Sequence, residues 1–420
     1  MIPDRLRHGR ASLGCAFLVQ GVAFALLVTR IPAIQDRYGV SDALLPAFLA
    51  AVPVLAGIGS VGAERLVRRT NARFVLRWAQ PVVLLALLGA GAGSRMVELA
   101  LALAVFGLAV GALDASMNML GVGLERAYGR SIMLGFHAAY SLGGIAGASL
   151  AWAGAHWDLS LVASYAPVVV VMLPAVLLAS RWYTDGGPVE RAAGEGGPAG
   201  AEAEVQNGAP GIGFRLLLPL CLVMAFAYIG DATVSNWSAK YLQDVLGGSE
   251  EAATLPYNAY MVTTLVGRAV GDVGVRRFGA VAVARAGAVL GAFGFLMVAV
   301  APGVWAGVAG FTVLGLGLCV IVPQTFAAAG RLAARSGRPG DVGSAVARLN
   351  VFNYVGFLIG SPLVGVVGDL WSYRWAMLVP AVLTLMTLLY ARSFADGAAR
   401  YGGWHERARA ADVGPGGHGL

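Results

Sequence analysis

Long apolar runs separated by short polar segments dominate the chain. The runs last about 20 residues, the length that a helix needs to cross a bilayer, and show no period-two alternation. Hydrocarbon offers the backbone no hydrogen-bond partners, whereas a helix satisfies its own, so the runs predict membrane helices rather than barrel strands. Reading them between charges and Gly/Pro turns predicts twelve spans, at residues 11–34, 43–63, 74–93, 97–124, 131–155, 159–181, 214–240, 253–275, 280–300, 303–330, 342–368 and 372–394.

Composition agrees with lipid as the main solvent of the chain. Hydrophobic residues make up 58 % of it and charged residues only 13 %, whereas a soluble domain is about half apolar and about a quarter charged. The first span follows Arg5, Arg7 and Arg10, as a signal peptide would. It is longer than a signal-peptide core and eleven more spans follow, so we expect it to remain in the mature protein. The expected fold class is a multi-pass, all-α membrane protein.

The basic residues predict the orientation. If the N-terminus is cytoplasmic, 25 of the 30 Lys and Arg residues fall in cytoplasmic segments, and the other five are Arg30, Arg37, Arg95, Lys240 and Arg374. This asymmetry follows the positive-inside rule and places both termini in the cytoplasm of a bacterial cell, with the spans in its inner membrane. The net charge of +7 is therefore interpreted as topology and contact with membrane lipids, not as a nucleic-acid partner.

A polar segment divides the spans into two sets. Residues 183–212 are rich in Gly, Pro, Glu and Ala, a composition that cannot bury a core and that predicts a disordered cytoplasmic linker. The predicted domains are an N-terminal six-helix bundle at 1–182 and a C-terminal six-helix bundle at 213–395. Residues 396–420 are expected to form a cytoplasmic tail.

The two predicted bundles share a sequence pattern. The segment from His137 to Gly147 aligns with the segment from Asn350 to Gly360 at an offset of 213 residues. Each begins with a polar residue, has another polar residue three positions later (Tyr140 and Asn353), and continues with GxxxG. Small residues at that spacing let membrane helices approach closely. Two pseudo-symmetric six-helix halves around a central site are typical of secondary transporters.

Ionisable groups inside a span cost about 2.5–3.5 kcal/mol each, and Asp114, Asp231 and His137 lie well inside predicted spans. Asp114 and Asn118 are four residues apart and share a helix face. The rise of a helix places Asn118 and His137 at similar depths from the cytoplasm. We interpret Asp114, with Asp231 and His137, as the proton-coupling groups. Two structural interpretations stay open, in which Asp114 is hydrogen-bonded for packing and His137 holds the fourth and fifth spans together.

Other polar side chains inside the spans predict the lining of a solute site. Trp237 and Asn236 follow Asp231 at the outer end of the seventh span, where an aromatic belt is also expected. The predicted solute-binding residues are Gln20, Asn118, His137, Tyr140, Asn236, Trp237, Asn258, Asn350 and Asn353. Arg30, at the outer end of the first span, fits either a side chain that extends to the interface or a gate residue paired with an acid.

Several kinds of chemistry have no sequence signature here. The chain contains no GxSxG, HExxH or P-loop motif, and Cys15, Cys221 and Cys319 have no disulfide or zinc spacing. We therefore expect neither an enzyme nor a bound cofactor or metal. Without an ATPase segment, uphill transport would draw on an ion gradient.

One loop resembles a known family. The segment from Gly267 to Gly279, which follows the eighth span, resembles the GxxxD-(R/K)-x-G-R-R signature of the major facilitator superfamily. The resemblance extends over nearly the whole chain and implies that Asp272, Arg276 and Arg277 gate the cytoplasmic side. The matching segment after the second span departs from the signature spacing but retains Glu64 and Arg65, which the resemblance implies as further gate residues. The family resemblance also implies a monomer that moves a small-molecule solute.

Within the superfamily the chain most resembles the fucose-permease and rhizopine-permease branch. The resemblance is carried by four segments, at residues 30–34, 111–118, 129–144 and 236–242. It implies a proton symporter for a sugar-like or other polar solute. Asn236 departs from the branch, which has Asp before this Trp. Two alternatives stay open: a proton-driven exporter of drugs or metabolites, although the fifth span lacks the Gly-Pro pair of that class, and a membrane sensor without flux.

Overall fold

The computed structural model describes residues 3–41, 44–184, 213–249, 252, 255–335, 338 and 340–395 of the 420. Over these ranges the chain is helical and contains no strand. Apart from residues 183 and 184, the predicted linker lies outside the described residues, and so does the predicted tail.

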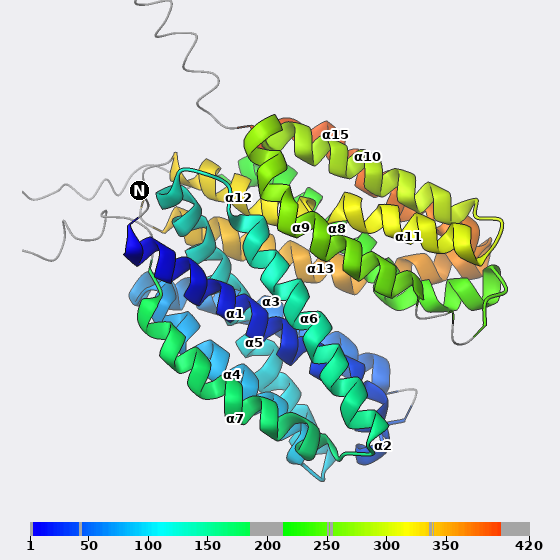
Figure 1. Cartoon of the computed structure of the whole chain (residues 1–420), viewed down its shortest axis with the longest axis horizontal. Helices are drawn as coiled ribbons and strands as arrows, with labels where there is room; N and C mark the ends of the chain where they lie inside the picture. Colours follow the sequence, from blue (N-terminus) through cyan, green and yellow to red (C-terminus); the bar gives the residue numbers. More distant parts are fainter. Residues whose placement is uncertain are drawn as a thin grey trace, which may run out of the picture.

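The helices fall into two consecutive sets, which Figure 1 shows side by side. The first set is α1 (Asp4–Thr29), α2 (Ile31–Tyr38), α3 (Leu45–Arg69), α4 (Ala72–Ala92), α5 (Met96–Tyr128), α6 (Met133–His156) and α7 (Leu161–Ala179). The second set is α8 (Phe214–Lys240), α9 (Leu255–Phe278), α10 (Ala280–Ala299), α11 (Val304–Leu318), α12 (Ile321–Ala334), α13 (Asp341–Leu370), α14 (Tyr373–Ala376) and α15 (Leu378–Tyr390). We call these sets the first and second halves.

Ten helical segments of the described chain are long and apolar enough to cross a membrane by length and composition. One of them joins α11 and α12, so the predicted span at 303–330 is divided near Cys319. Helices α6 and α9, each of 24 residues, run beside these segments and complete twelve. They are less apolar because α6 is rich in Gly, Ala and Ser and α9 carries four charged residues. The predicted all-α fold of two six-helix bundles is confirmed.

Glycines of the sequence repeat make equivalent contacts in both halves. A Cβ on Gly143 of α6 would lie 2.0 Å from the carbonyl oxygen of Leu18 on α1. A Cβ on Gly356 of α13 would lie 2.5 Å from the carbonyl oxygen of Ala225 on α8. Small residues let the paired backbones approach this closely. The pattern at an offset of 213 residues is therefore also a repeat of helix packing.

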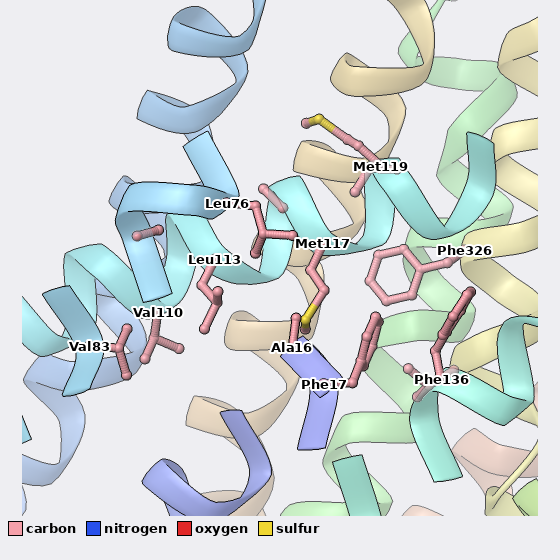
Figure 2. Packing of buried hydrophobic residues seen from close by; sticks show 14 of the residues in the cluster. Ala16, Phe17, Leu76, Val83, Val110, Leu113, Met117, Met119, Phe136 and Phe326 are labelled. Atoms are coloured by element: carbon pink, nitrogen blue, oxygen red, sulfur yellow. The ribbon is translucent and has the colours of Figure 1, made fainter. Parts of the chain in front are cut away.

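Aromatic rings pack together where the halves meet. Figure 2 shows Phe17 of α1, Phe136 of α6 and Phe326 of α12 gathered beside the apolar core of the first half. The rings of Phe17 and Phe136 are stacked with centroids 5.5 Å apart. Across the halves, α3 packs on α13, α6 on α9, and α5 on α12. These pairs bring residues far apart in sequence to one central axis.

The two ends of the molecule differ. Helices α1, α6, α8 and α13 begin at one end, and there the halves are joined by hydrogen bonds and an ion pair between α6 and α9 and between α5 and α12. We call this end the closed side and the opposite end the open side.

Candidate functional site

A cavity of about 1140 Å³ lies between the halves and extends toward the open side. Its wall includes the last residues of α1 and the first residues of α9, both at the open side, and it reaches the centre of the molecule at α5, α6 and α13. Ten of the predicted proton-coupling and solute-binding residues line it: Gln20, Asp114, Asn118, His137, Tyr140, Asp231, Asn236, Asn258, Asn350 and Asn353.

Asp114 joins the two halves at the centre of the cavity. Its carboxylate accepts a hydrogen bond from Gln20 of α1 and one from the hydroxyl of Tyr354 on α13. Tyr354 lies in the second half, so this bond spans the interface. Hydrogen bonds to a charged group are stronger than neutral ones, and a low-dielectric site strengthens them further. The charge state of Asp114 thus affects how firmly the halves are held together.

Asn118 and His137 line the same cavity from α5 and α6. Both helices pack on α1 and also contact each other. Asn118 donates to the carbonyl oxygen of Asp114 at 2.9 Å, within its own helix. The ring of His137 lies between Phe17 and Phe326, with centroid distances of 5.2 and 6.2 Å. The interpretation of His137 as a direct link between the fourth and fifth spans is therefore replaced by packing on α1 and α12.

The second half contributes a carboxylate and a guanidinium. Asp231 of α8 accepts a hydrogen bond from the Tyr260 hydroxyl of α9 at 2.6 Å. Arg268, also on α9, is the one Lys or Arg among the described residues that line the cavity. It donates to Ser141 Oγ of α6 at 2.6 Å and to the Cys319 carbonyl oxygen at 3.3 Å. Arg268 thereby forms a second central contact between the halves.

Two predicted residues serve other contacts. Trp237 is absent from the cavity lining; its indole nitrogen donates to the Ser361 carbonyl oxygen at 3.0 Å, and its ring packs on Tyr373. Arg30 is buried and donates to the carbonyl oxygens of Ala151 and Leu159. It thus neither extends to the interface nor joins the halves, because these contacts tie the end of α1 to α6 and the segment that follows it.

Asp272 joins the halves at the closed side. Its carboxylate accepts from Ser131 Oγ at 2.6 Å and from the backbone nitrogens of Leu134 and Gly135, at 3.3 and 3.0 Å. It therefore caps the positive N-terminal end of α6 from the opposite half. Arg276 adds a bond to the Ser131 carbonyl oxygen at 2.9 Å. These two residues of the predicted gate do bridge the halves.

The side chains of Glu64 and Arg277, which were also predicted as gate residues, contact neighbours on their own helices. Glu64 pairs with Arg68 at 2.8 Å along α3, and Arg65 is exposed beside them. The guanidinium of Arg277 lies 5.4 Å from the ring centroid of Phe278. The degenerate signature after the second span thus corresponds to a pairing within α3.

Sequence reasoning missed a second closed-side contact. Glu125 of α5 accepts from the backbone nitrogens of Ile132 and Met133, both at 2.9 Å, and lies 3.5 Å from an Arg331 nitrogen on α12. It caps α6 from its own half and forms an ion pair with the other half. The available signal was an acidic residue at the end of an apolar run, close to the start of the next one.

The central partners Tyr354 and Arg268 were also missed. Tyr354 follows the selected Asn353, so its position in the eleventh span was visible. Arg268 lies inside the predicted span at 253–275 but was counted with the cytoplasmic charges. Helix α9 continues to Phe278, so Arg268 is ten residues from its end, or roughly 15 Å at 1.5 Å per residue.

The sequence matches one family model and is similar to two bacterial transporters. The family model of the Major Facilitator Superfamily matches residues 220–408. An uncharacterised MFS-type transporter of Yersinia pestis is 29 % identical over 392 residues, which cover 91 % of this chain and 95 % of that protein. An uncharacterised transporter of Sinorhizobium fredii is 25 % identical over 387 residues, which cover 90 % of this chain and 96 % of that transporter.

Solved structures share the fold. FucP in the outward conformation, the fucose:proton symporter of E. coli, superposes with a TM-score of 0.74 and 17 % identity, covering 92 % of this chain and 98 % of FucP. The proton:xylose symporter XylE superposes with a TM-score of 0.72 and 12 % identity, covering 93 % of this chain and 96 % of XylE.

Proposed function

Because the chain belongs to the major facilitator superfamily, we propose that it carries a small polar, sugar-like solute across the bacterial inner membrane by alternating access, driven by protons. As a transporter of this family it is a multi-pass membrane protein and not an enzyme. The solute, the coupling to protons and the direction of transport are the proposed part. We further propose that it works as a monomer with both termini in the cytoplasm.

The position of Asp114 is the observation that carries the proposal. It is a carboxylate on the wall of a cavity open to one side, and it accepts a hydrogen bond from the opposite half through Tyr354. An ionisable residue at membrane depth is costly and is retained where it serves a pathway or a proton relay. A group with these contacts can link proton uptake to the separation of the halves.

The coupling follows from hydrogen-bond chemistry. An ionised Asp114 accepts bonds from both Gln20 and Tyr354, and protonation turns one of its oxygens into a donor. The contact with Tyr354 then weakens, because its acceptor is no longer charged. With the central bond weakened and solute bound, the halves can rock and open the closed side. Asp231 and His137 are the further groups proposed to exchange protons during this cycle.

Direction follows from the predicted orientation. The positive-inside asymmetry predicts that the closed side faces the cytoplasm, and we propose on that basis that the cavity opens to the periplasm. The neighbours named as sugar:proton symporters support uptake, with the fold as the shared property. Solute and protons would enter the cavity from the periplasm and leave when the contacts of Asp272 and Glu125 open.

Flux in proteoliposomes tests the proposal. A thermal-shift screen of sugars, polyols and amphiphilic drugs on the purified protein selects the solute, because a ligand of the folded state raises its stability. Uptake of the labelled hit is then measured with an inward proton gradient. We expect accumulation that a protonophore abolishes. Binding without any flux would instead indicate a sensor, and export driven by the gradient would indicate the exporter alternative.

A further inference from the structure

Three cavity-lining side chains carry polar atoms that have no hydrogen-bond partner among the described residues. These atoms are Asn118 Oδ1, His137 Nε2, and both the Oδ1 and the Nδ2 of Asn350. The three residues are buried, with exposed fractions of 3, 8 and 0 %. A buried polar atom without a partner destabilises a fold, and native proteins keep few of them. A group of such atoms around one cavity, contributed by both halves, therefore points to a ligand.

The three side chains lie at one depth. Asn118 is one turn beyond Asp114 on α5, which runs toward the closed side. His137 is one turn before Ser141 on α6, and Asn350 is one turn before Tyr354 on α13; both helices run away from the closed side. All three are therefore about 6 Å closer to the closed side than the central contacts. We call Asn118, His137 and Asn350 the floor layer.

Contacts between the halves enclose the floor layer on two sides. Toward the open side are the bonds of Tyr354 with Asp114 and of Arg268 with Ser141. Toward the closed side, the contacts of Asp272 begin at Ser131, which is six residues before His137. A solute that moves between the two sides of the membrane must pass this level.

The unpaired atoms define what the floor layer can bind. Asn118 Oδ1 and Asn350 Oδ1 only accept hydrogen bonds, and Asn350 Nδ2 only donates them. A complementary group supplies at least two donors and one acceptor. Two neighbouring hydroxyl groups meet this requirement, whereas a carboxylate has no donor and an ammonium has no acceptor. Phe17 and Phe326, which pack on His137, also line the cavity and add apolar surface beside the polar atoms.

We propose that the floor layer is a solute subsite that binds a pair of neighbouring hydroxyl groups, and that the solute enters it when the central contacts open. The proposal rests on the proposed transport function and names the part of the solute that this site recognises. Asn350 is its specificity-determining residue, because both polar atoms of its side chain lack a hydrogen-bond partner among the described residues.

The stability of the solute-free protein provides the first test. Asn350→Leu removes two unpaired atoms at nearly constant shape, so we expect the Tm of the solute-free protein to rise by roughly 2 °C or more. Asn353→Leu is the matched control on the same helix, since Asn353 is hydrogen-bonded to the Tyr228 hydroxyl. Its Tm should fall. A fall of similar size in Asn350→Leu would overturn the proposal, because it would indicate a structural role.

Binding provides the second test, with D-galactose, D-xylose and myo-inositol as probes in thermal-shift titrations. We expect at least one to raise the Tm of the unsubstituted protein, and Asn350→Leu to weaken its binding by about tenfold or more. For that probe, replacing single hydroxyls by fluorine should weaken binding at two neighbouring positions, and the effect should vanish in Asn350→Leu. No shift with any probe, or equal binding by the variant, would overturn the subsite.

The two proposals fail separately. Proton-driven flux with solute binding that is unchanged in Asn350→Leu leaves the carrier in place and removes the subsite. Probe binding that depends on Asn350, without flux in proteoliposomes, leaves the subsite in place and removes the carrier.

Discussion

Ser141 and Tyr354 occupy equivalent positions in the two halves, 213 residues apart, and each bonds to a charged residue of the opposite half. Ser141 accepts a hydrogen bond from Arg268, and Tyr354 donates one to Asp114. The repeat therefore places two central contacts of opposite polarity on equivalent helices, α6 and α13. Because both partners line the cavity, solute and protons reach the same residues that hold the halves together.

The first prediction concerns Asp114. Asp114→Asn keeps the size of the side chain and an acceptor for Tyr354, but the amide cannot exchange a proton. We expect proton-driven uptake in proteoliposomes to fall to the level of protein-free vesicles, with folding and solute binding retained. Asp244→Asn is the control, because Asp244 is an exposed residue paired with Lys240 outside the cavity. Uptake equal to that of the unsubstituted protein in Asp114→Asn would remove this carboxylate from the coupling.

The second prediction concerns the closed side. Asp272→Ala leaves three donors at the start of α6 without their acceptor. A hydrogen bond to a charged group contributes about 1.5–3 kcal/mol, so the closed side should open in a much larger share of molecules. Spin labels at the exposed positions Thr70 and Phe278, in a background without cysteine, would report longer distances between the halves.

Glu64→Gln provides the control for that measurement. Glu64 pairs with Arg68 along one helix near the surface, and such pairs contribute about 0–1 kcal/mol. We expect its distance distribution to match that of the unsubstituted protein. If Asp272→Ala also matched it, the contact at the start of α6 would not be what keeps this side closed.

The third prediction concerns orientation. A reporter fused at residue 195, in the segment between the sixth and seventh predicted spans, should be cytoplasmic, because most Lys and Arg residues lie in segments on the same side as this one. Green fluorescent protein at this position should therefore fluoresce, and alkaline phosphatase should be inactive. Active phosphatase would show that residue 195 is periplasmic. The predicted orientation would then be wrong, and the cavity would open to the cytoplasm.

Local features of the sequence predicted the spans and much of the cavity lining. Apolar length marks a span whatever its neighbours are, and a polar residue inside a span, such as Gln20 or Asn350, is recognisable by its cost in hydrocarbon. The GxxxG spacing that begins at Gly143 and at Gly356 also predicted close helix packing at these two glycines. These properties depend on a residue and its helix alone.

Pairing across the halves could not be predicted in the same way. Whether Asp114 contacts Tyr354, or Glu125 contacts Arg331, depends on how two separate bundles face each other. No periodicity within one helix records that arrangement. Arg268 was missed for a related reason: it lies inside the predicted span at 253–275, but its charge was interpreted only as a sign of topology, whereas α9 carries the guanidinium into the cavity wall.

The last prediction tests the repeat through two adjacent glycines. Gly143→Ala would put a Cβ 2.0 Å from the Leu18 carbonyl oxygen, so α1 and α6 must move apart. Overpacking of this kind costs about 1–3 kcal/mol, and we expect a clear loss of Tm in detergent. Gly144→Ala has no atom within 4 Å of the added Cβ, and alanine favours a helix over glycine by up to about 1 kcal/mol. Its Tm should stay equal or rise. Because Gly356 is the equivalent of Gly143, Gly356→Ala should repeat the loss through α8 and α13; a neutral result there would mean that the two halves do not share this packing requirement.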